Sequence, residues 1–372
     1  MKALSVLHVN TEMTWRGGEA QTLMLARGLA QRWHRSLLAV GRGGVLERSA
    51  RAEGLETFPL PMKGEFDPVS IVRLAGIVRR AGVDLLHYHS SHAITIGTLA
   101  SFLAGRRPAV LTRRVSFPMK RNPIARLKYT FRIDHLIAVA DGIRWIMMAE
   151  GIAPDRVSVI HSGIDLSRYD GAEPDRPRLA QELGIAADAF LVGAIGHLAP
   201  HKGHAVLLEA LAGIAPHLDS LRLIVIGDGE ERARLETIAA AGPMAGRTLF
   251  AGFRTDVPWI LASLDLLVLP SLSGEGSPAV VKEAMASGVP VVASDLDGIR
   301  EIVEDGTEAI LVPAGDAERL ARAVQKIAAA PGLRAELTAR GRERVREFSM
   351  DRMVERTLEI YQQVTERRPA RR

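Results

Sequence analysis

Two glutamates, Glu275 and Glu283, lie eight residues apart in the stretch SGEGSPAVVKEAM. Paired carboxylates carry general acid and base chemistry, and a retaining glycosidase needs two of them about 5 Å apart across the scissile bond. Glu275 falls in the loop after the apolar run DLLVLPS, whereas Glu283 falls in the second turn of a predicted helix that ends at Gly288. Because one side chain precedes the helix and the other projects from it, the spacing favours one ligand held at two points over a glycosidase-type pair.

Two further loops carry residues suited to binding an anion. Gly17 and Gly18 follow the apolar run LSVLHVN and precede a predicted helix over residues 20–32, so backbone N–H groups can approach a ligand closely. In GHLAPHKGH, which follows the predicted strand FLVGAI, Lys202 lies just before the next helix and can meet a phosphate. The histidines of this second loop lack the spacing of a helical metal pair and have no acidic or cysteine neighbour, so we expect no metal site.

The first half of the chain offers polar groups at the ends of two predicted strands. The run PAVLT is followed by Arg113 and Arg114, and VDLLHYHS contains His87 and His89. An arginine can bind a phosphate or a carboxylate through two parallel hydrogen bonds. A structural role and a substrate-facing role both fit the strand-end histidines.

The composition is that of a globular protein large enough for two domains, with 372 residues, 47% of them hydrophobic and 24% charged. The absence of cysteine excludes disulfides and thiol catalysis and suits a cytosolic chain. The N-terminal apolar run is too short for a signal peptide, and no apolar stretch reaches the length that spans a bilayer. We therefore expect a cytoplasmic protein.

Positive charge gathers between residues 101 and 135, which hold nine Lys or Arg against one acid, Asp134. Such a patch suits an anionic membrane surface, nucleic acid or an acidic substrate, and it can also be a plain solvated face. Nucleic acid is suggested by charge alone and is not expected as a partner, so the patch at 106–132 becomes a candidate contact with the inner face of the plasma membrane. Its basic residues are Arg106, Arg107, Arg113, Arg114, Lys120, Arg121, Arg126, Lys128 and Arg132, interleaved with Phe102, Phe117, Tyr129 and Phe131.

The elements that must position these residues follow a β-α-β rhythm. Short apolar runs alternate with helical-period stretches through residues 1–168, pause in the turn-rich segment HSGIDLSRYDGAEPDRPRLAQELG, and resume through residues 169–349. This pattern predicts an α/β protein with two doubly wound, Rossmann-like parallel-sheet domains that face a cleft, with ligands at the carboxyl ends of the strands. Residues 350–367 predict one further helix.

In combination, these motifs resemble the retaining glycosyltransferases of family four, also called glycosyl transferases group 1, which have the GT-B fold. The resemblance covers nearly the whole chain and is carried by the GGE loop, HSGID, GHLAPHKG, AGFRTDV and EGSPAVVKEAMASGVPVVAS, the last with the family's two glutamates. It implies an acceptor-binding domain at 1–168, with the C-terminal helix of 350–372 packed back on it, and a nucleotide-sugar-binding domain at 169–349.

The resemblance also implies roles for individual residues. Lys202 would stabilise the donor diphosphate as it leaves, Glu275 would contact the sugar hydroxyls, and Glu283 would accept hydrogen bonds from the ribose. No metal and no cofactor are implied beyond the nucleotide-sugar donor, for which UDP is expected from its frequency in the family. The implied catalytic residues are Lys202, Glu275 and Arg114. The backbone around Phe253 and Arg254 would hold the nucleobase, and the backbone N–H groups of Gly276 to Ala279 would lie near the sugar and the phosphate. The implied donor-binding residues are Gly17, Gly18, His197, Lys202, Phe253, Arg254, Glu275, Gly276, Ser277, Pro278, Ala279 and Glu283.

The sequence departs from the family pattern at two positions. His197 stands beside the glycine of the phosphate loop, where the family usually has arginine, and this makes the grip on diphosphate weaker or pH-dependent. Arg114 stands after the strand PAVLT, where the family often has histidine, and an arginine cannot act as an acid or a base. We therefore expect an acidic group on the acceptor or donor sugar near Arg113 or Arg114, with His89 as a further acceptor contact.

The implied reaction moves a sugar, with retention of anomeric configuration, to a hydroxyl of a cell-envelope glycan or glycolipid such as lipopolysaccharide. A nucleotide-sugar epimerase or a sugar phosphorylase would use the same fold. A third alternative is a protein that binds a sugar nucleotide without catalysing a reaction. The presence of Lys202, Glu275 and Glu283 argues against this alternative. A dehydrogenase using NAD would need a full glycine fingerprint followed by an acid about 20 residues later, which neither domain shows.

Overall fold

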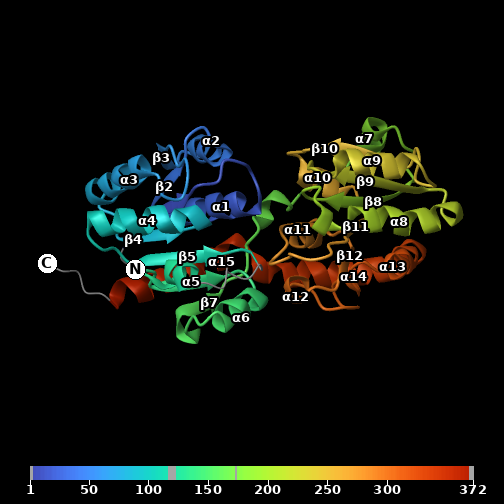
Figure 1. Cartoon of the computed structure of the whole chain (residues 1–372). Helices are drawn as coiled ribbons and strands as arrows, with labels where there is room; N and C mark the ends of the chain where they lie inside the picture. Colours follow the sequence, from blue (N-terminus) through green and yellow to red (C-terminus); the bar gives the residue numbers. More distant parts are fainter. Residues whose placement is uncertain (1–2, 116–122, 172–173, 368–372) are drawn as a thin grey trace. The chain divides into compact units, whose positions relative to one another are not determined.

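The computed structural model describes residues 3–115, 123–171 and 174–367. The chain forms two compact units, of which the first comprises Met1–Gly163 with Met350–Arg372 and the second comprises Ile164–Ser349 (Figure 1). The sequence pattern places the first boundary after residue 168, whereas the chain leaves the first unit after Gly163. Helix α15 (Met350–Glu366), red in Figure 1, belongs to the first unit.

The first unit is built on one parallel sheet of seven strands in the order β3-β2-β1-β4-β5-β6-β7. The strands are β1 (Ser5–Asn10), β2 (Arg35–Gly41), β3 (Glu56–Leu60), β4 (Leu85–Tyr88), β5 (Ala109–Arg113), β6 (His135–Ala138) and β7 (Val157–Val159). The helices between them are α1 (Gly17–Gln31), α2 (Val45–Ala52), α3 (Pro68–Arg80), α4 (Ser91–Ala104), α5 (Pro123–Thr130) and α6 (Asp141–Ala149), with the 3-10 turn η1 (Pro154–Arg156).

The second unit repeats this plan with a parallel sheet of six strands in the order β10-β9-β8-β11-β12-β13. The strands are β8 (Phe190–Ile195), β9 (Leu221–Ile226), β10 (Thr248–Gly252), β11 (Leu266–Leu269), β12 (Val291–Ser294) and β13 (Ile310–Val312). The helices are α7 (Arg176–Leu183), α8 (His204–Ile214), α9 (Arg232–Ala240), α10 (Val257–Ala262), α11 (Ala279–Ser287), α12 (Asp297–Arg300), α13 (Ala317–Ala329) and α14 (Pro331–Arg344). The 3-10 turns are η2 (Leu166–Arg168), η3 (Pro200–Lys202), η4 (Ala215–His217) and η5 (Val345–Phe348).

The predicted pair of doubly wound parallel sheets is therefore confirmed. In each sheet the strand order reverses beside the first strand of the unit, between β1 and β4 and between β8 and β11. At such a switch point the two flanking loops turn to opposite faces, which opens a crevice at the carboxyl ends of the strands. The loops after β1, β4, β8 and β11 are the ones that carry the candidate residues.

Some elements differ from the sequence expectation. Helix α1 begins at Gly17, so the two glycines form its first turn instead of a loop ahead of it. Helix α7 lies inside the turn-rich segment in which the sequence predicts a pause between the two domains. Asp175 caps the helix by accepting from the N–H of Arg178. Strand β3 contains Pro59, which removes a backbone donor, and the strand accordingly lies at the edge of its sheet.

Helix α15 completes one face of the first sheet. Its side chains Val354, Leu358 and Tyr361 are buried in one cluster with Val6 of β1 and Leu29 of α1. Helices α1 and α15 approach so closely that a Cβ on Gly28 would lie 2.5 Å from a methyl carbon of Val354. Helices α1 and α15 therefore cover the residues that lie at the carboxyl ends of the strands on this face.

Among the described residues, no helix combines the length and the apolar character needed to cross a membrane.

Candidate active site

The switch point of the second unit brings Lys202 and Glu275 together. Lys202 ends η3 after strand β8, and Glu275 lies in the loop after β11. The Lys202 ammonium lies 2.7 Å from Glu275 Oε1, which also accepts from the Ser271 hydroxyl. The carboxylate of Glu275 is nearly buried and the ammonium is only partly exposed. A phosphate that binds Lys202 would therefore compete with Glu275 for the same ammonium.

Two glycines allow this close arrangement. Gly203 has a φ of +67° and its missing Cβ would lie 2.0 Å from the carbonyl oxygen of Pro270, so only glycine lets η3 pack against the end of β11. Gly298 of α12 lies under the Glu275 loop, where a Cβ would come within 2.3 Å of the Glu275 carbonyl oxygen. The backbone around both charged residues is thus fixed by contacts that tolerate no side chain.

Glu283 has a different partner. It projects from helix α11 and accepts a hydrogen bond from the phenol of Tyr169, which lies just after η2. Burial raises the pKa of Glu283, and the Tyr169 hydrogen bond opposes that shift. The helix begins at Ala279 with Pro278 as its N-cap and ends, as predicted, before a left-handed Gly288. The two glutamates therefore belong to separate hydrogen-bonded groups, one around Lys202 and one around Tyr169.

The remaining donor-site candidates of the second unit lie at the ends of strands β8, β10 and β11. His197 pairs at 3.2 Å with Glu230, and both side chains are exposed. Arg254 donates to Asp256 and Glu182, which raise the pKa of its guanidinium, so its side chain is already engaged and its backbone remains the contact the family resemblance implies. Phe253 is 68% exposed, and Gly276 and Pro278 are buried beside the half-buried Ser277.

Sequence reasoning missed Lys282, one of the largest fully buried side chains of the protein. Its ammonium donates to the Ser277 hydroxyl at 2.9 Å and lies 5.4 Å from the centre of the Phe348 ring. Burial lowers the pKa of Lys282 to about 7, and the neighbouring carboxylate of Glu283 opposes this shift. The signal was present in the spacing, because Lys282 lies three positions before the buried Met285 and follows the buried Val281 on the apolar stripe of α11.

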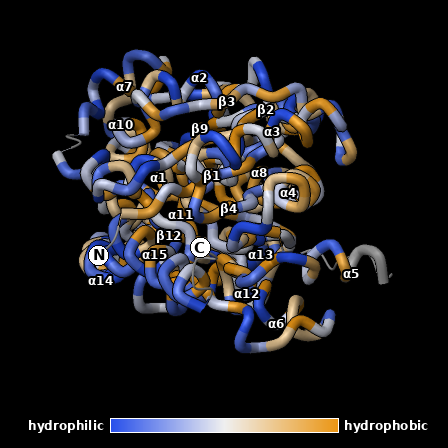
Figure 2. The backbone as a smooth tube through the Cα atoms, turned by 90° about the vertical axis from the view of Figure 1, so that its left-hand side faces the viewer, coloured by the Kyte–Doolittle hydropathy of each residue, from blue (hydrophilic) through white to orange (hydrophobic). Residues whose placement is uncertain are grey.

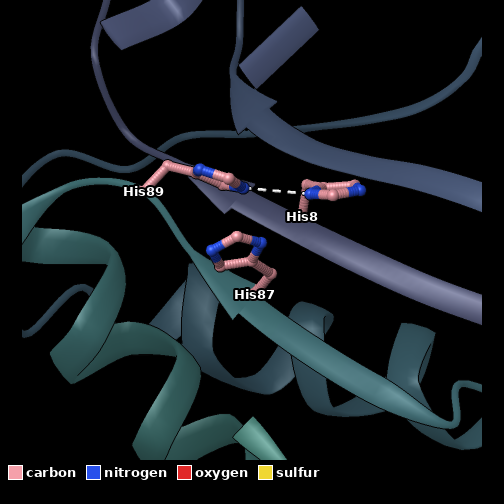
Figure 3. A group of neighbouring side chains, drawn as sticks. All are labelled: His8, His87 and His89. Atoms are coloured by element: carbon pink, nitrogen blue, oxygen red, sulfur yellow. Dashed lines mark hydrogen bonds between the residues drawn. The ribbon is translucent and has the colours of Figure 1, made fainter. Parts of the chain in front are cut away.

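The first unit holds a buried polar cluster at its own switch point. Side chains alternate between the faces of a strand, so His8 of β1, His87 of β4 and His89 beyond β4 share the face that α1 and α15 cover. Figure 3 shows the three rings together, with the hydrogen bond between His8 and His89. His87 hydrogen-bonds Thr112 with one ring nitrogen and Tyr361 of α15 with the other. Sequence reasoning missed His8 and Tyr361.

The hydrogen bonds of this cluster fix where the protons lie. Burial lowers the pKa of His8 to about 3 and those of His87 and His89 well below their usual range, so all three rings are neutral. The guanidinium of Arg114 is a pure donor and lies 3.3 Å from His89 Nδ1, which must accept. His89 Nε2 then carries the hydrogen and donates to His8 Nδ1 at 2.9 Å. The hydrogen of His8 is left on Nε2, a buried atom with no partner among the described residues.

The three ring systems offer nitrogen atoms within 4.8 Å of one another, a spacing that can accommodate a metal ion. Both nitrogens of His87 are already hydrogen-bonded, both nitrogens of His89 are as well, and the Arg114 cation is in direct contact with the cluster. These bonds fit a neutral scaffold that supports Arg114 better than a ligand set for a cation.

Arg113 and Arg114 point to opposite faces of the sheet. Arg113 is buried and pairs with Glu150 of the α6 C-terminus at 3.0 Å. Arg114 lies beside the first turn of α1, where a Cβ on Gly18 would be 3.8 Å from its Cδ. Among the described residues Arg114 forms no ion pair within 4 Å, and its Nε is buried without a partner. Of the two arginines, it is Arg114 that keeps unused donors, next to the Gly17–Gly18 turn.

Two Rossmann-like units with parallel sheets of seven and six strands define the GT-B fold. The model of Glycosyl transferases group 1 matches residues 175–344, and that of Glycosyltransferase Family 4 matches residues 15–168. The chain belongs to this family of glycosyltransferases, as the resemblance indicated.

The chain is also similar to individual glycosyltransferases and to a solved structure. A phosphatidyl-myo-inositol mannosyltransferase of Mycolicibacterium smegmatis is 30% identical over 94% of this chain and 90% of its own length. The lipopolysaccharide core biosynthesis glycosyltransferase LpsE of Rhizobium meliloti is 36% identical over 48% of this chain and 52% of its own length. Anabaena Alr3699/HepE, solved in complex with UDP-glucose, shares the fold with a TM-score of 0.85 at 23% identity, covering 97% of this chain and all of that chain.

The two adjacent arginines should respond differently to replacement. Arg113→Met should lower the free energy of unfolding by about 2–4 kcal/mol, because it takes this cation from a largely buried Glu150. Arg114→Met should change it less, by about 1 kcal/mol, because Glu19, the carboxylate that acts on the Arg114 charge, forms no ion pair with it within 4 Å. Urea unfolding at neutral pH measures both values. Equal losses in the two variants would contradict the assignment of Arg113 to structure and Arg114 to ligand.

Proposed function

We propose that the protein is a retaining glycosyltransferase that moves a sugar from a UDP-sugar to a hydroxyl of a cell-envelope glycan or glycolipid. The observation that carries the proposal is the Lys202–Glu275 pair at the switch point of the second unit, next to the loop that leads into α11. The solved neighbour that binds UDP-glucose supports the choice of UDP, and the relatives that act on phosphatidyl-myo-inositol and in lipopolysaccharide core biosynthesis support a cell-envelope acceptor.

In the proposed reaction the bond between the anomeric carbon and the diphosphate breaks, and UDP leaves with the electron pair. Lys202 stabilises the charge that develops on the leaving oxygen, and Glu275 positions the sugar through its hydroxyls. The acceptor hydroxyl attacks the anomeric carbon from the face that UDP leaves, and it gives its proton to the departing phosphate. The proposed donor-binding residues are all those that the family resemblance implies, Gly17, Gly18 and Glu283 among them, and neither a metal nor another cofactor takes part.

The proposal is tested by a nucleotide panel and a product analysis. UDP and UDP-sugars should raise the melting temperature of the protein, because they bind the folded state. With a glycolipid acceptor, the anomeric configuration of the product should match that of the donor. Phosphate-dependent cleavage without an acceptor would indicate a phosphorylase, interconversion of the donor an epimerase, and binding without any chemistry a non-catalytic protein; each would contradict the proposal.

Replacing each of the two glutamates should affect a different property of the enzyme. Glu275→Ala should lower kcat about 100-fold, because its contacts are made to the reacting sugar, and should not weaken nucleotide binding, because it also removes the competitor for the Lys202 ammonium. Glu283→Ala should mainly weaken UDP binding, by about tenfold, because it removes acceptors for the ribose hydroxyls. Steady-state kinetics and calorimetry separate the two. Tyr169→Phe is the matched control, since it removes the partner of Glu283 and keeps the carboxylate. Equal kcat losses with unchanged UDP binding in both glutamate variants would return the pair to a shared catalytic role.

Arg114 further indicates that the acceptor or the donor sugar carries an acidic group. Its guanidinium lies at the end of β5, donates to the neutral His89 and adjoins the N-terminal turn of α1. The carboxylate of Glu19 in that turn acts on its charge, but among the described residues no carboxylate lies within ion-pair distance of Arg114. Burial lowers its pKa to about 10, which leaves it cationic at neutral pH. An anion would satisfy both this charge and the helix N–H groups.

Replacing Arg114 tests this substrate class. Arg114→Gln should raise the KM for an acidic acceptor about tenfold, because a charge-assisted pair is lost, and should leave the KM for a neutral analogue within about twofold. An unchanged KM for the acidic acceptor, with an acidic donor sugar also unaffected, would show that no acidic group binds there.

We also propose that the first unit docks on an anionic membrane surface at the cytoplasmic face. Phe102 on α4 and Phe131 after α5 are 61% and 48% exposed, and the guanidinium of Arg132 lies over both rings. Helix α4 also exposes Leu99 and Leu103; Figure 2 shows it largely orange. Exposed apolar side chains beside cations fit an interface of anionic headgroups. Arg113 is buried and does not join this surface, and Lys120, Arg121, Phe117 and the side chain of Arg126 lie outside the described residues.

Vesicle sedimentation tests this docking. The protein should bind vesicles of phosphatidylglycerol about tenfold more tightly than vesicles of phosphatidylcholine, and added salt should weaken the binding. Phe102→Glu with Phe131→Glu should abolish the preference, whereas Ile238→Glu on α9, also an exposed apolar side chain, should not. Equal binding to both vesicles, or equal effects of the two sets of substitutions, would rule the surface out.

A further inference from the structure

Lys282 occupies a position that is costly for a lysine. Its side chain is fully buried, and it lies near the amino end of α11, where the helix dipole disfavours a cation. The neighbouring apolar positions Val281, Ala284 and Met285 show that the site could hold an apolar side chain. A buried charge kept at such cost suggests a role outside stability, and its contacts indicate which one.

The contact of interest is Ser277, which lies between Gly276 and Pro278 in the loop that carries Glu275. The Lys282 ammonium donates to the Ser277 hydroxyl oxygen at 2.9 Å. In its protonated form Lys282 has three hydrogens and no acceptor, so the hydroxyl oxygen accepts in this bond. The hydroxyl hydrogen of Ser277 is then left for another acceptor. Ser277 is partly exposed, in contrast to its two buried neighbours, so that acceptor can come from a ligand.

The surroundings keep this geometry fixed. The ring of Phe348 lies 5.4 Å from the Lys282 ammonium, and the ring face attracts the cation. The loop itself rests on Gly298, where a Cβ would come within 2.4 Å of the Gly276 carbonyl oxygen. The position of Ser277 is therefore fixed by the hydrogen bond from Lys282 of α11 and by the packing of α12 against its loop.

We infer that Lys282 is a positioning residue that fixes the Ser277 hydroxyl as a hydrogen-bond donor to a phosphate or sugar oxygen of the nucleotide sugar. This inference rests on the proposed function, because it assumes that the loop after β11 holds such a donor substrate. It assigns to Ser277 a side-chain contact beyond the backbone contact that the family resemblance implies. Lys282 itself touches no substrate and acts through Ser277.

A double-mutant cycle with two readouts tests it. The affinities for UDP-glucose and UDP and the melting temperature are measured for the wild type, Ser277→Ala, Lys282→Met and the double variant. Ser277→Ala and Lys282→Met should each weaken the binding of UDP-glucose about fivefold. The double variant should bind it no more weakly than the single variants, because the same hydrogen bond is lost in all three. Loss for UDP-glucose alone would place the contact on the sugar, and loss for both on the phosphate.

Melting temperature separates positioning from a structural role. Lys282→Met should melt at the same temperature as the wild type or higher, since an apolar side chain of similar length replaces a buried cation. Lys326→Met on α13, an exposed lysine, is the control and should change neither readout. Additive losses in the cycle, or a lower melting temperature with unchanged affinity in Lys282→Met, would overturn the inference. If the wild type binds none of UDP, GDP and ADP, the donor assignment of the proposed function falls together with it.

Discussion

The reversal of strand order in each sheet is the constraint on which every other feature depends. Because all strands of each sheet are parallel, their carboxyl ends lie at one edge, and the reversal between β1 and β4 and between β8 and β11 opens that edge at one place in each unit. Residues far apart in the sequence meet there, as Lys202 and Glu275 do. Glycines at the loop bases, such as Gly203 and Gly298, let the backbones approach closely enough for these contacts.

The two switch points differ in their charge balance. In the second unit the Lys202 cation is paired with Glu275, and the buried Lys282 adds a charge that acts through Ser277. In the first unit Arg114 is supported by neutral histidines and has no carboxylate in an ion pair among the described residues. A paired cation such as Lys202 binds a phosphate only by exchanging its carboxylate for it. A cation outside an ion pair, such as Arg114, binds an anion without first giving up a partner. This difference underlies the separate donor and acid-binding roles proposed for the two units.

The fold and the family could be predicted from the sequence because both depend on local patterns. Apolar runs of strand length alternate with helical periods, and the motif around Glu275 and Glu283 is specific in its spacing. Contacts made across the sheet could not be predicted: nothing local joins His8 to His89 or Tyr361 to His87. The opposite fates of Arg113 and Arg114 follow from strand alternation once β5 is known, and the burial of Lys282 follows from the apolar stripe of α11. The pairing of Lys202 with Glu275 needed the strand order.

The central claim is that Glu275 and the donor diphosphate compete for the Lys202 ammonium. The affinity of Glu275→Gln for UDP, measured by calorimetry, tests it most directly, because UDP lacks the sugar that Glu275 is proposed to contact. The amide keeps the shape of the side chain and removes its charge, so the Lys202 ammonium becomes free for phosphate. We predict that the variant binds UDP about three- to tenfold more tightly than the wild type. Weaker binding of UDP by Glu275→Gln would contradict the account, since it would make the carboxylate part of the diphosphate site instead of a competitor for its lysine.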